Sequence, residues 1–182
     1  MNGEFSRLVG REKLAEANLA ASASLHEIEA SAEERQALAK RFSLMALDSL
    51  RARIAVAPAA GGTLIRVSGQ FEAEVVQACV VSLEPVRSRI SEALEQLYSL
   101  SEAAAAELEV EVGPDDEDPP EPIGPEGIDI GELVAQQLAV AIDPYPRAEG
   151  ASLEALREAG LTGEAGAAEG PFAALAPLRR SS

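Results

Sequence analysis

The region from residue 50 to residue 85 constrains the fold most, because apolar and polar residues alternate on both sides of a glycine-containing turn. A period of two gives a strand one apolar and one solvated face, so the pattern predicts an antiparallel hairpin with half of each strand buried. Gly61 and Gly62 supply the positive φ angles of a tight turn. Gly69 falls on the apolar face in mid-strand, where a bulge or a sharp bend is expected. The side chains expected in the core are Leu50, Ala52, Ile54, Val56, Ile65, Val67, Phe71, Ala73 and Val75.

Two amphipathic helices are predicted from their caps and their apolar spacing. Ser31 and Glu34 have the spacing of a capping box at the start of a helix over 31–42. A second capping box, with Asp129 at the cap, precedes an apolar stripe over 130–142. Shorter alternating runs predict further strands at 4–9, 25–29 and 108–112.

The segment 86–100 fits two secondary structures. Val86, Ile90, Leu94 and Leu97 recur at helical spacing, and this periodicity alone favours a helix. The same segment also fits a strand, because Val86 and Ile90 are an even number of residues apart.

The chain of 182 residues is long enough for one domain with a core and a tail. We expect residues 1–146 to form a single α+β domain, with an antiparallel, barrel-like sheet and two or three flanking amphipathic helices. Residues 113–127 contain five prolines and six acidic residues, which predicts an acidic, proline-rich loop within this domain. Residues 147–182 form a low-complexity C-terminal tail that ends in a short apolar motif. This motif either docks on the domain or is captured by a partner, and its residues are Pro171, Phe172, Leu175 and Leu178.

The charge of the chain indicates which partners it can bind. The net charge is −16, and a field of this sign repels phosphate, so direct contact with nucleic acid is not expected. The expected partner is a basic protein, and the alternative is that the acidic surface is simply solvated. The N-terminus shows no signal sequence and no run of apolar residues is long enough to cross a membrane, so a cytoplasmic protein is expected.

The residues needed for catalysis or metal binding do not come together in the sequence. Cys79 and His26 are single residues of their type, and neither lies in a nucleophile or zinc-binding motif. His26 is expected at the surface. The acidic run 115–118 lacks the ligand spacing and the turn glycine of a calcium loop. We therefore expect no enzyme, no catalytic residue, no metal and no cofactor.

Three motifs in a fixed order resemble one protein family. The first is the segment QACVVSLEP at 77–85, and the second is GIDIGELV at 127–134, which leads to DPYP at 143–146. The third is PFAAL at 171–175. The chain resembles the YceD family of large ribosomal RNA subunit accumulation proteins, and the helix SAEERQALAKRF with the CVVSLEP motif resembles its alphaproteobacterial branch.

The resemblance implies a function and a strand, and the chain departs from the family pattern at one position. It implies a non-enzymatic factor in large-subunit biogenesis or ribosomal RNA accumulation; the alternative is an acidic interaction module or chaperone unrelated to ribosomes. It also implies that 86–100 is a strand, and we adopt that assignment against the periodicity. Many members have a C-x-x-C pair where this chain has Cys79 and Ser82, so Cys79 is expected to be a small buried apolar residue without a metal or redox role. The candidate interaction or family-motif residues are Cys79, Leu83, Glu84, Pro85, Asp129, Pro171, Phe172, Leu175 and Leu178.

Overall fold

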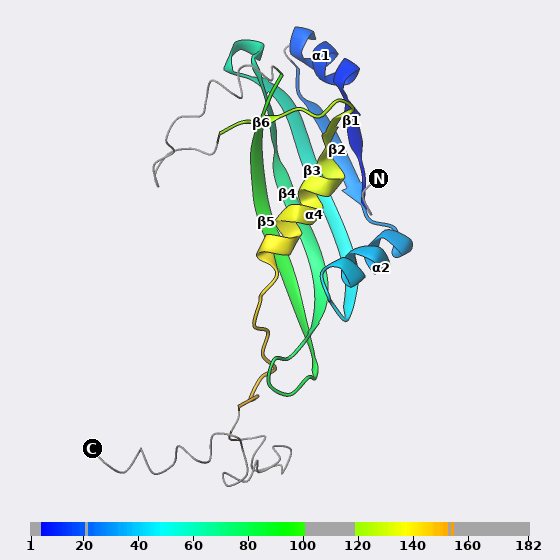
Figure 1. Ribbon diagram of the computed structural model, residues 1–182, viewed down its shortest axis with the longest axis vertical. Helices are drawn as coiled ribbons and strands as arrows, with labels where there is room; N and C mark the ends of the chain where they lie inside the picture. Colours follow the sequence, from blue (N-terminus) through cyan, green and yellow to red (C-terminus); the bar gives the residue numbers. More distant parts are fainter. Residues whose placement is uncertain (1–4, 21, 101–118, 153, 155–182) are drawn as a thin grey trace, which may run out of the picture.

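The computed structural model describes residues 5–20, 22–100, 119–152 and 154 (Figure 1). Its elements are β1 (Leu8–Gly10), α1 (Arg11–Ala20), β2 (Ser24–Glu29), α2 (Ala32–Arg41), β3 (Ala46–Ala59), β4 (Leu64–Ala78), β5 (Pro85–Ser99), β6 (Glu121–Pro122), β7 (Gly127–Asp129) and α4 (Ile130–Ala141). One sheet has the strand order β2-β3-β4-β5-β6, and β1 pairs with β7 in a second, two-stranded sheet. The α+β class is confirmed.

The hairpin predicted from the alternating pattern is formed by β3 and β4. The two strands pair antiparallel from Ala46 opposite Val76 to Ala59 opposite Leu64. Gly61 and Gly62 in the turn have φ angles of 68° and 90°. Residues other than glycine are strained at such positive φ angles. All nine side chains expected in the core of this hairpin are buried. The pleat of the two strands therefore sets the position of the whole core.

The hairpin contains a bulge, but not at the predicted residue. The register shifts between Leu47 and Ser49, which leaves both Leu47 and Leu50 buried although they are three residues apart. Gly69 pairs regularly with Ile54, so a bulge at Gly69 was a wrong prediction. A Cβ atom on Gly69 would lie 2.0 Å from the Arg53 carbonyl oxygen, so close approach of the neighbouring backbone is the reason for the glycine.

The segment after Pro85 is the strand β5, as the resemblance implied, and the helix favoured by periodicity is wrong. It pairs antiparallel with β4 along its whole length, from Leu64 opposite Ser99 to Ala78 opposite Pro85. Ile90, Leu94 and Tyr98 are buried on the inner face of the sheet. Their spacing of four residues fits a strand as well as a helix, because four is twice the strand period.

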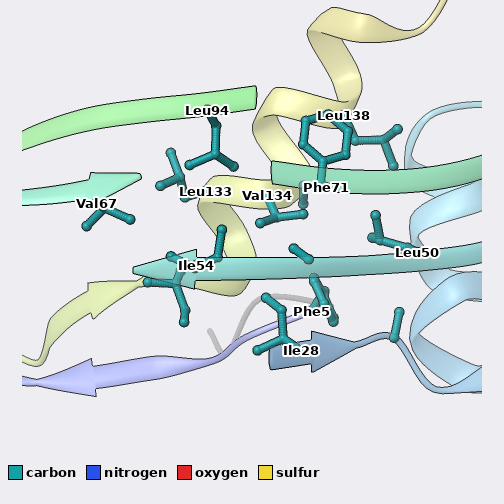
Figure 2. Close-up of a cluster of buried hydrophobic side chains, with 14 of the residues drawn as sticks. Phe5, Ile28, Leu50, Ile54, Val67, Phe71, Leu94, Leu133, Val134 and Leu138 are labelled. Atoms are coloured by element: carbon teal, nitrogen blue, oxygen red, sulfur yellow. The ribbon is translucent and has the colours of Figure 1, made fainter. Parts of the chain in front are cut away.

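The sheet is open, so the expectation of a barrel was wrong. β2 lies at one edge, and at the other edge β6 is two residues long and pairs in parallel only with Tyr98 and Ser99. Because β2 and β6 do not pair, the sheet does not close. The helix α4 lies across one face of the sheet instead (Figure 1). Its side chains Leu133, Val134 and Leu138 meet residues of β3, β4 and β5 in the core (Figure 2).

The helix caps follow the sequence closely. Ser31 and Glu34 form the predicted capping box at the start of α2. Asp129 caps α4 by accepting from the N–H groups of Gly131 and Glu132. The predicted capping box at α4 differs in its second half, because the Glu132 carboxylate binds Arg41 of α2 at 2.7 Å.

The N-terminal and proline-rich segments form more structure than their patterns indicated. The helix α1 was not predicted, and its Leu14 is buried. The predicted strand at 4–9 is shorter, as β1, and pairs with β7. Within the expected acidic loop, Ile123 is buried and its N–H donates to the Ser99 carbonyl at 3.2 Å. Residues 113–118 and the predicted strand at 108–112 lie outside the described residues.

Candidate functional site

The connection between β4 and β5, residues 79–84, is a closed turn docked on the segment after α4. The Cys79 N–H donates to the Glu84 carbonyl at 2.8 Å, and the Leu83 N–H donates to the Cys79 carbonyl at 3.0 Å. The Val80 N–H donates to the carbonyl of Pro146 at 2.9 Å. Figure 1 shows this turn at one end of the molecule, where the chain that leaves α4 runs beside it. Two family motifs, 77–85 and 143–146, therefore meet at one place.

The Cys79 thiol organises this turn. Cys79 is buried, as expected, but its sulfur is not in an apolar setting. Three backbone N–H groups point at Sγ, from Val81 at 3.4 Å, Ser82 at 3.3 Å and Ala148 at 3.3 Å. These N–H donors, of which that of Ala148 has the largest effect, outweigh burial and lower the pKa of Cys79 to about 6.

This acceptor role of Cys79 was not predicted from the sequence. The signal was the tight turn itself, because the second and third N–H groups after a cysteine in such a turn point back at its sulfur. Ser82, at the position where the resemblance implied a second cysteine in many members, donates from its hydroxyl to the Glu84 carboxylate at 3.2 Å. The turn is therefore fixed by hydrogen bonds at both positions of the C-x-x-C pattern.

The Cys79 thiol is expected to ionise with a midpoint near pH 6 in the folded chain, because its pKa is lowered from 9.0 to about 6. The ionised sulfur stabilises the fold, so this contribution is complete above the unfolded pKa and is lost as the pH falls through about 6. The ultraviolet absorbance of the thiolate, followed against pH, measures the midpoint.

The control for this titration is Cys79→Ala, which supplies the absorbance baseline. Its stability is expected to lack the rise with pH between about 6 and 9 that the wild-type chain shows. A wild-type midpoint above pH 8, as for a thiol in water, would contradict the donor geometry.

Leu83, Glu84 and Pro85 complete the turn at its exposed side. Leu83 is 74% exposed and has a φ angle of 63°, which is unusual for a leucine. Glu84 is exposed, and Pro85 begins β5. The structure thus brings Cys79, Leu83, Glu84 and Pro85 together.

Asp129 lies apart from this turn and holds the N-terminal segment to α4. Its carboxylate accepts from Ser6 Oγ at 2.5 Å and from the Arg7 N–H at 2.8 Å, besides capping the helix. Arg7 in turn forms a bidentate pair with Glu34, which lowers the pKa of Glu34 to about 2. Asp129 therefore has a structural role in the described residues. The remaining candidates, Pro171, Phe172, Leu175 and Leu178, lie outside them.

No candidate metal-binding cluster lies in the described part of the chain. Its His, Cys, Asp and Glu side chains do not gather in groups of three or more that could hold a metal ion. His26 is half-buried and its Nε2 lies 3.0 Å from Ser24 Oγ. Of the helices in the described ranges, none is long and apolar enough to cross a membrane.

Comparisons with known proteins address the family. A comparison with curated proteins finds no match, and a comparison with solved structures finds none. The family model described as large ribosomal RNA subunit accumulation protein YceD matches residues 67–179. The match covers β4 from Val67 onward, the turn at Cys79, β5 and α4, together with the tail motif. It extends over more than half of the chain, and the chain therefore belongs to the YceD family.

Proposed function

We propose that this chain is a cytoplasmic, non-enzymatic factor in large ribosomal subunit biogenesis that affects ribosomal RNA through a basic protein partner. The observation that carries the proposal is the family match over residues 67–179, because the family is described by large ribosomal RNA subunit accumulation. The partner would be a basic ribosomal protein or a basic assembly factor, whose positive charge complements the net charge of −16.

The distribution of charge supports a protein partner over direct RNA contact. RNA phosphates need accessible arginine or lysine side chains, and the net charge of the chain is −16. Six arginines of the described residues are held in ion pairs with carboxylates. These pairs are Arg7 with Glu34, Arg41 with Glu132, Arg53 with Glu27, Arg66 with Glu95, Arg87 with Asp48, and Arg89 with Glu72.

On the outer face of the sheet, arginine side chains again lie beside carboxylates. A hollow of about 350 Å³ over β2, β3 and β4 is lined by Arg51 and Arg53, but also by Glu27, Glu29 and Glu72. A phosphate placed there would meet three carboxylates beside two guanidinium groups, so the hollow is poorly suited to an RNA backbone.

Recovery of partners on the purified, immobilised chain tests the proposal. With nuclease-treated lysate at low salt, a basic large-subunit protein or assembly factor is expected among the bound species, and raising the salt should weaken its retention. Binding of purified ribosomal RNA is measured in parallel at physiological salt and is expected to be weak. Recovery of naked RNA without any protein partner would refute the proposal.

A further inference from the structure

One end of the molecule exposes apolar side chains that folding does not use. Val80, Leu83 and Tyr145, which we call the apolar tip, are 46%, 74% and 72% exposed. Val80 is bonded through its N–H to Pro146, the neighbour of Tyr145, and Leu83 through its N–H to Cys79, the neighbour of Val80. These bonds bring the backbone next to Val80, Leu83 and Tyr145 together at this end of the molecule. Such clustering of exposed apolar residues marks an interaction site more often than scattered ones do.

Leu83 carries the strongest indication that the apolar tip has a ligand. Its φ angle of 63° lies in the left-handed region, where glycine or asparagine would be free of strain. The Leu83 side chain is 74% exposed, so its burial adds little to the stability of the fold. Strained residues cluster at ligand-binding and switch regions, so contact with another molecule would account for an exposed leucine in this conformation.

The backbone of the apolar tip is preorganised by hydrogen bonds. Its backbone is fixed by the three N–H groups on Cys79 Sγ and by the bond from Gln77 Nε2 to the Asp143 carbonyl at 2.7 Å. Because the backbone is already ordered, binding does not lose the conformational entropy that ordering a mobile loop would cost.

The charges around the apolar tip define the chemistry of its partner. The segments 79–84 and 142–150, which build it, contain the acids Glu84, Asp143 and Glu149 against one base, Arg147. Glu84 and Asp143 are both exposed. An apolar centre with acidic neighbours is complementary to a protein segment that combines an apolar anchor with lysine or arginine.

We propose that the apolar tip is the surface that binds the basic protein partner, with an apolar partner side chain seated among Val80, Leu83 and Tyr145. Lysine or arginine side chains of the partner then lie against Glu84 and Asp143. This inference rests on the proposed function and gives the partner's place on the molecule.

Two substitutions of Leu83 separate binding from folding. Leu83→Gly and Leu83→Asn both remove the apolar side chain and both accept a positive φ angle, so stability should stay the same or rise. The probe is the mixture of proteins released by high salt from purified large ribosomal subunits. Affinity of the retained basic protein is expected to fall about tenfold or more in both variants.

Leu25→Ala is the matched control, because Leu25 is 82% exposed but lies at the other end of the sheet. Leu25 of β2 pairs with Ala55 of β3, and Ala55 pairs with Ser68 of β4. Ser68 lies roughly 30 Å along β4 from the turn at 79–84. Its affinity should equal that of the wild-type chain. Unchanged affinity in both Leu83 variants would overturn the inference.

A photo-crosslinking residue in place of Leu83, with the same residue in place of Leu25 as control, identifies the occupant in cells. A basic protein crosslinked from position 83 and not from position 25 is the expected result. Crosslinks only to residues 155–182 of the same chain, to a second copy, or to RNA would overturn the inference, as would their absence. Failure of the proposed function would appear separately, as normal large-subunit levels in cells that lack the chain.

Discussion

Replacing Gly69 with alanine is expected to lower the free energy of unfolding by about 3 kcal/mol or more, one of the largest effects of a single methyl group in this chain. The added Cβ would lie 2.0 Å from the Arg53 carbonyl oxygen and 3.0 Å from the Arg53 carbonyl carbon, both backbone atoms that cannot rotate away. Since β3 and β4 form the centre of the sheet, the strands must separate locally to accept it. Denaturant unfolding followed by circular dichroism measures the loss.

Ser68→Ala is the control for this substitution. Ser68 is the neighbouring residue of β4 and half-buried on the opposite face, so its loss should change stability by no more than about 0.5 kcal/mol. If Gly69→Ala were as stable as Ser68→Ala, the two strands would be further apart in solution than in this structure.

Replacing Leu138 with alanine is expected to cost about 2–5 kcal/mol, because the side chain is fully buried between α4 and the sheet (Figure 2). The removed atoms lose their transfer free energy and leave a cavity between α4 and the strands. The fall in the unfolding free energy, again from denaturant titration, tests whether α4 covers the sheet as a fixed element.

Val140→Ala is the matched control on the same helix, since Val140 is 84% exposed. Its effect should stay within about 0.5 kcal/mol. Similar small effects at both positions would mean that α4 is not docked on the sheet, and the position of the chain beside the turn at Cys79 would then have no support.

The sequence predicted the elements whose apolar pattern matches a single period. The hairpin, α2 and α4 are of this kind, because their buried residues repeat at two or at 3.6 residues and their caps are explicit. The pattern of β5 does not match a single period, because Glu92 on the inner face is exposed. The buried residues Ile90 and Leu94 are therefore four residues apart, a spacing that fits both a strand and a helix. The pairing partner, which no local pattern contains, decides the structure of this segment.

The barrel and the bulge at Gly69 were wrong for a related reason. Whether a sheet closes depends on which strands meet at its edges, and the edge strand β6 comes from a proline-rich segment with no strand pattern. A glycine on an apolar face indicates close approach or irregularity without distinguishing them, and here Asp48 carries the irregularity.

The site was predictable as a set of residues but not as a surface. Cys79, Leu83, Glu84 and Pro85 are adjacent in sequence, so their meeting needs no fold. Pro146 and Ala148 were not associated with them, because their hydrogen bonds to the turn depend on the direction in which the chain leaves α4. The positive φ angle of Leu83 likewise has no signature in a leucine.

We propose above that the chain supports large ribosomal subunits through a protein contact. Sucrose-gradient profiles and ribosomal RNA precursors of cells lacking the chain, restored with the wild-type or the Leu83→Gly form, test it most directly. We expect a deficit of large subunits and of their RNA that the wild-type form corrects and the Leu83→Gly form, at equal abundance, does not. Normal large subunits without the chain would contradict the account.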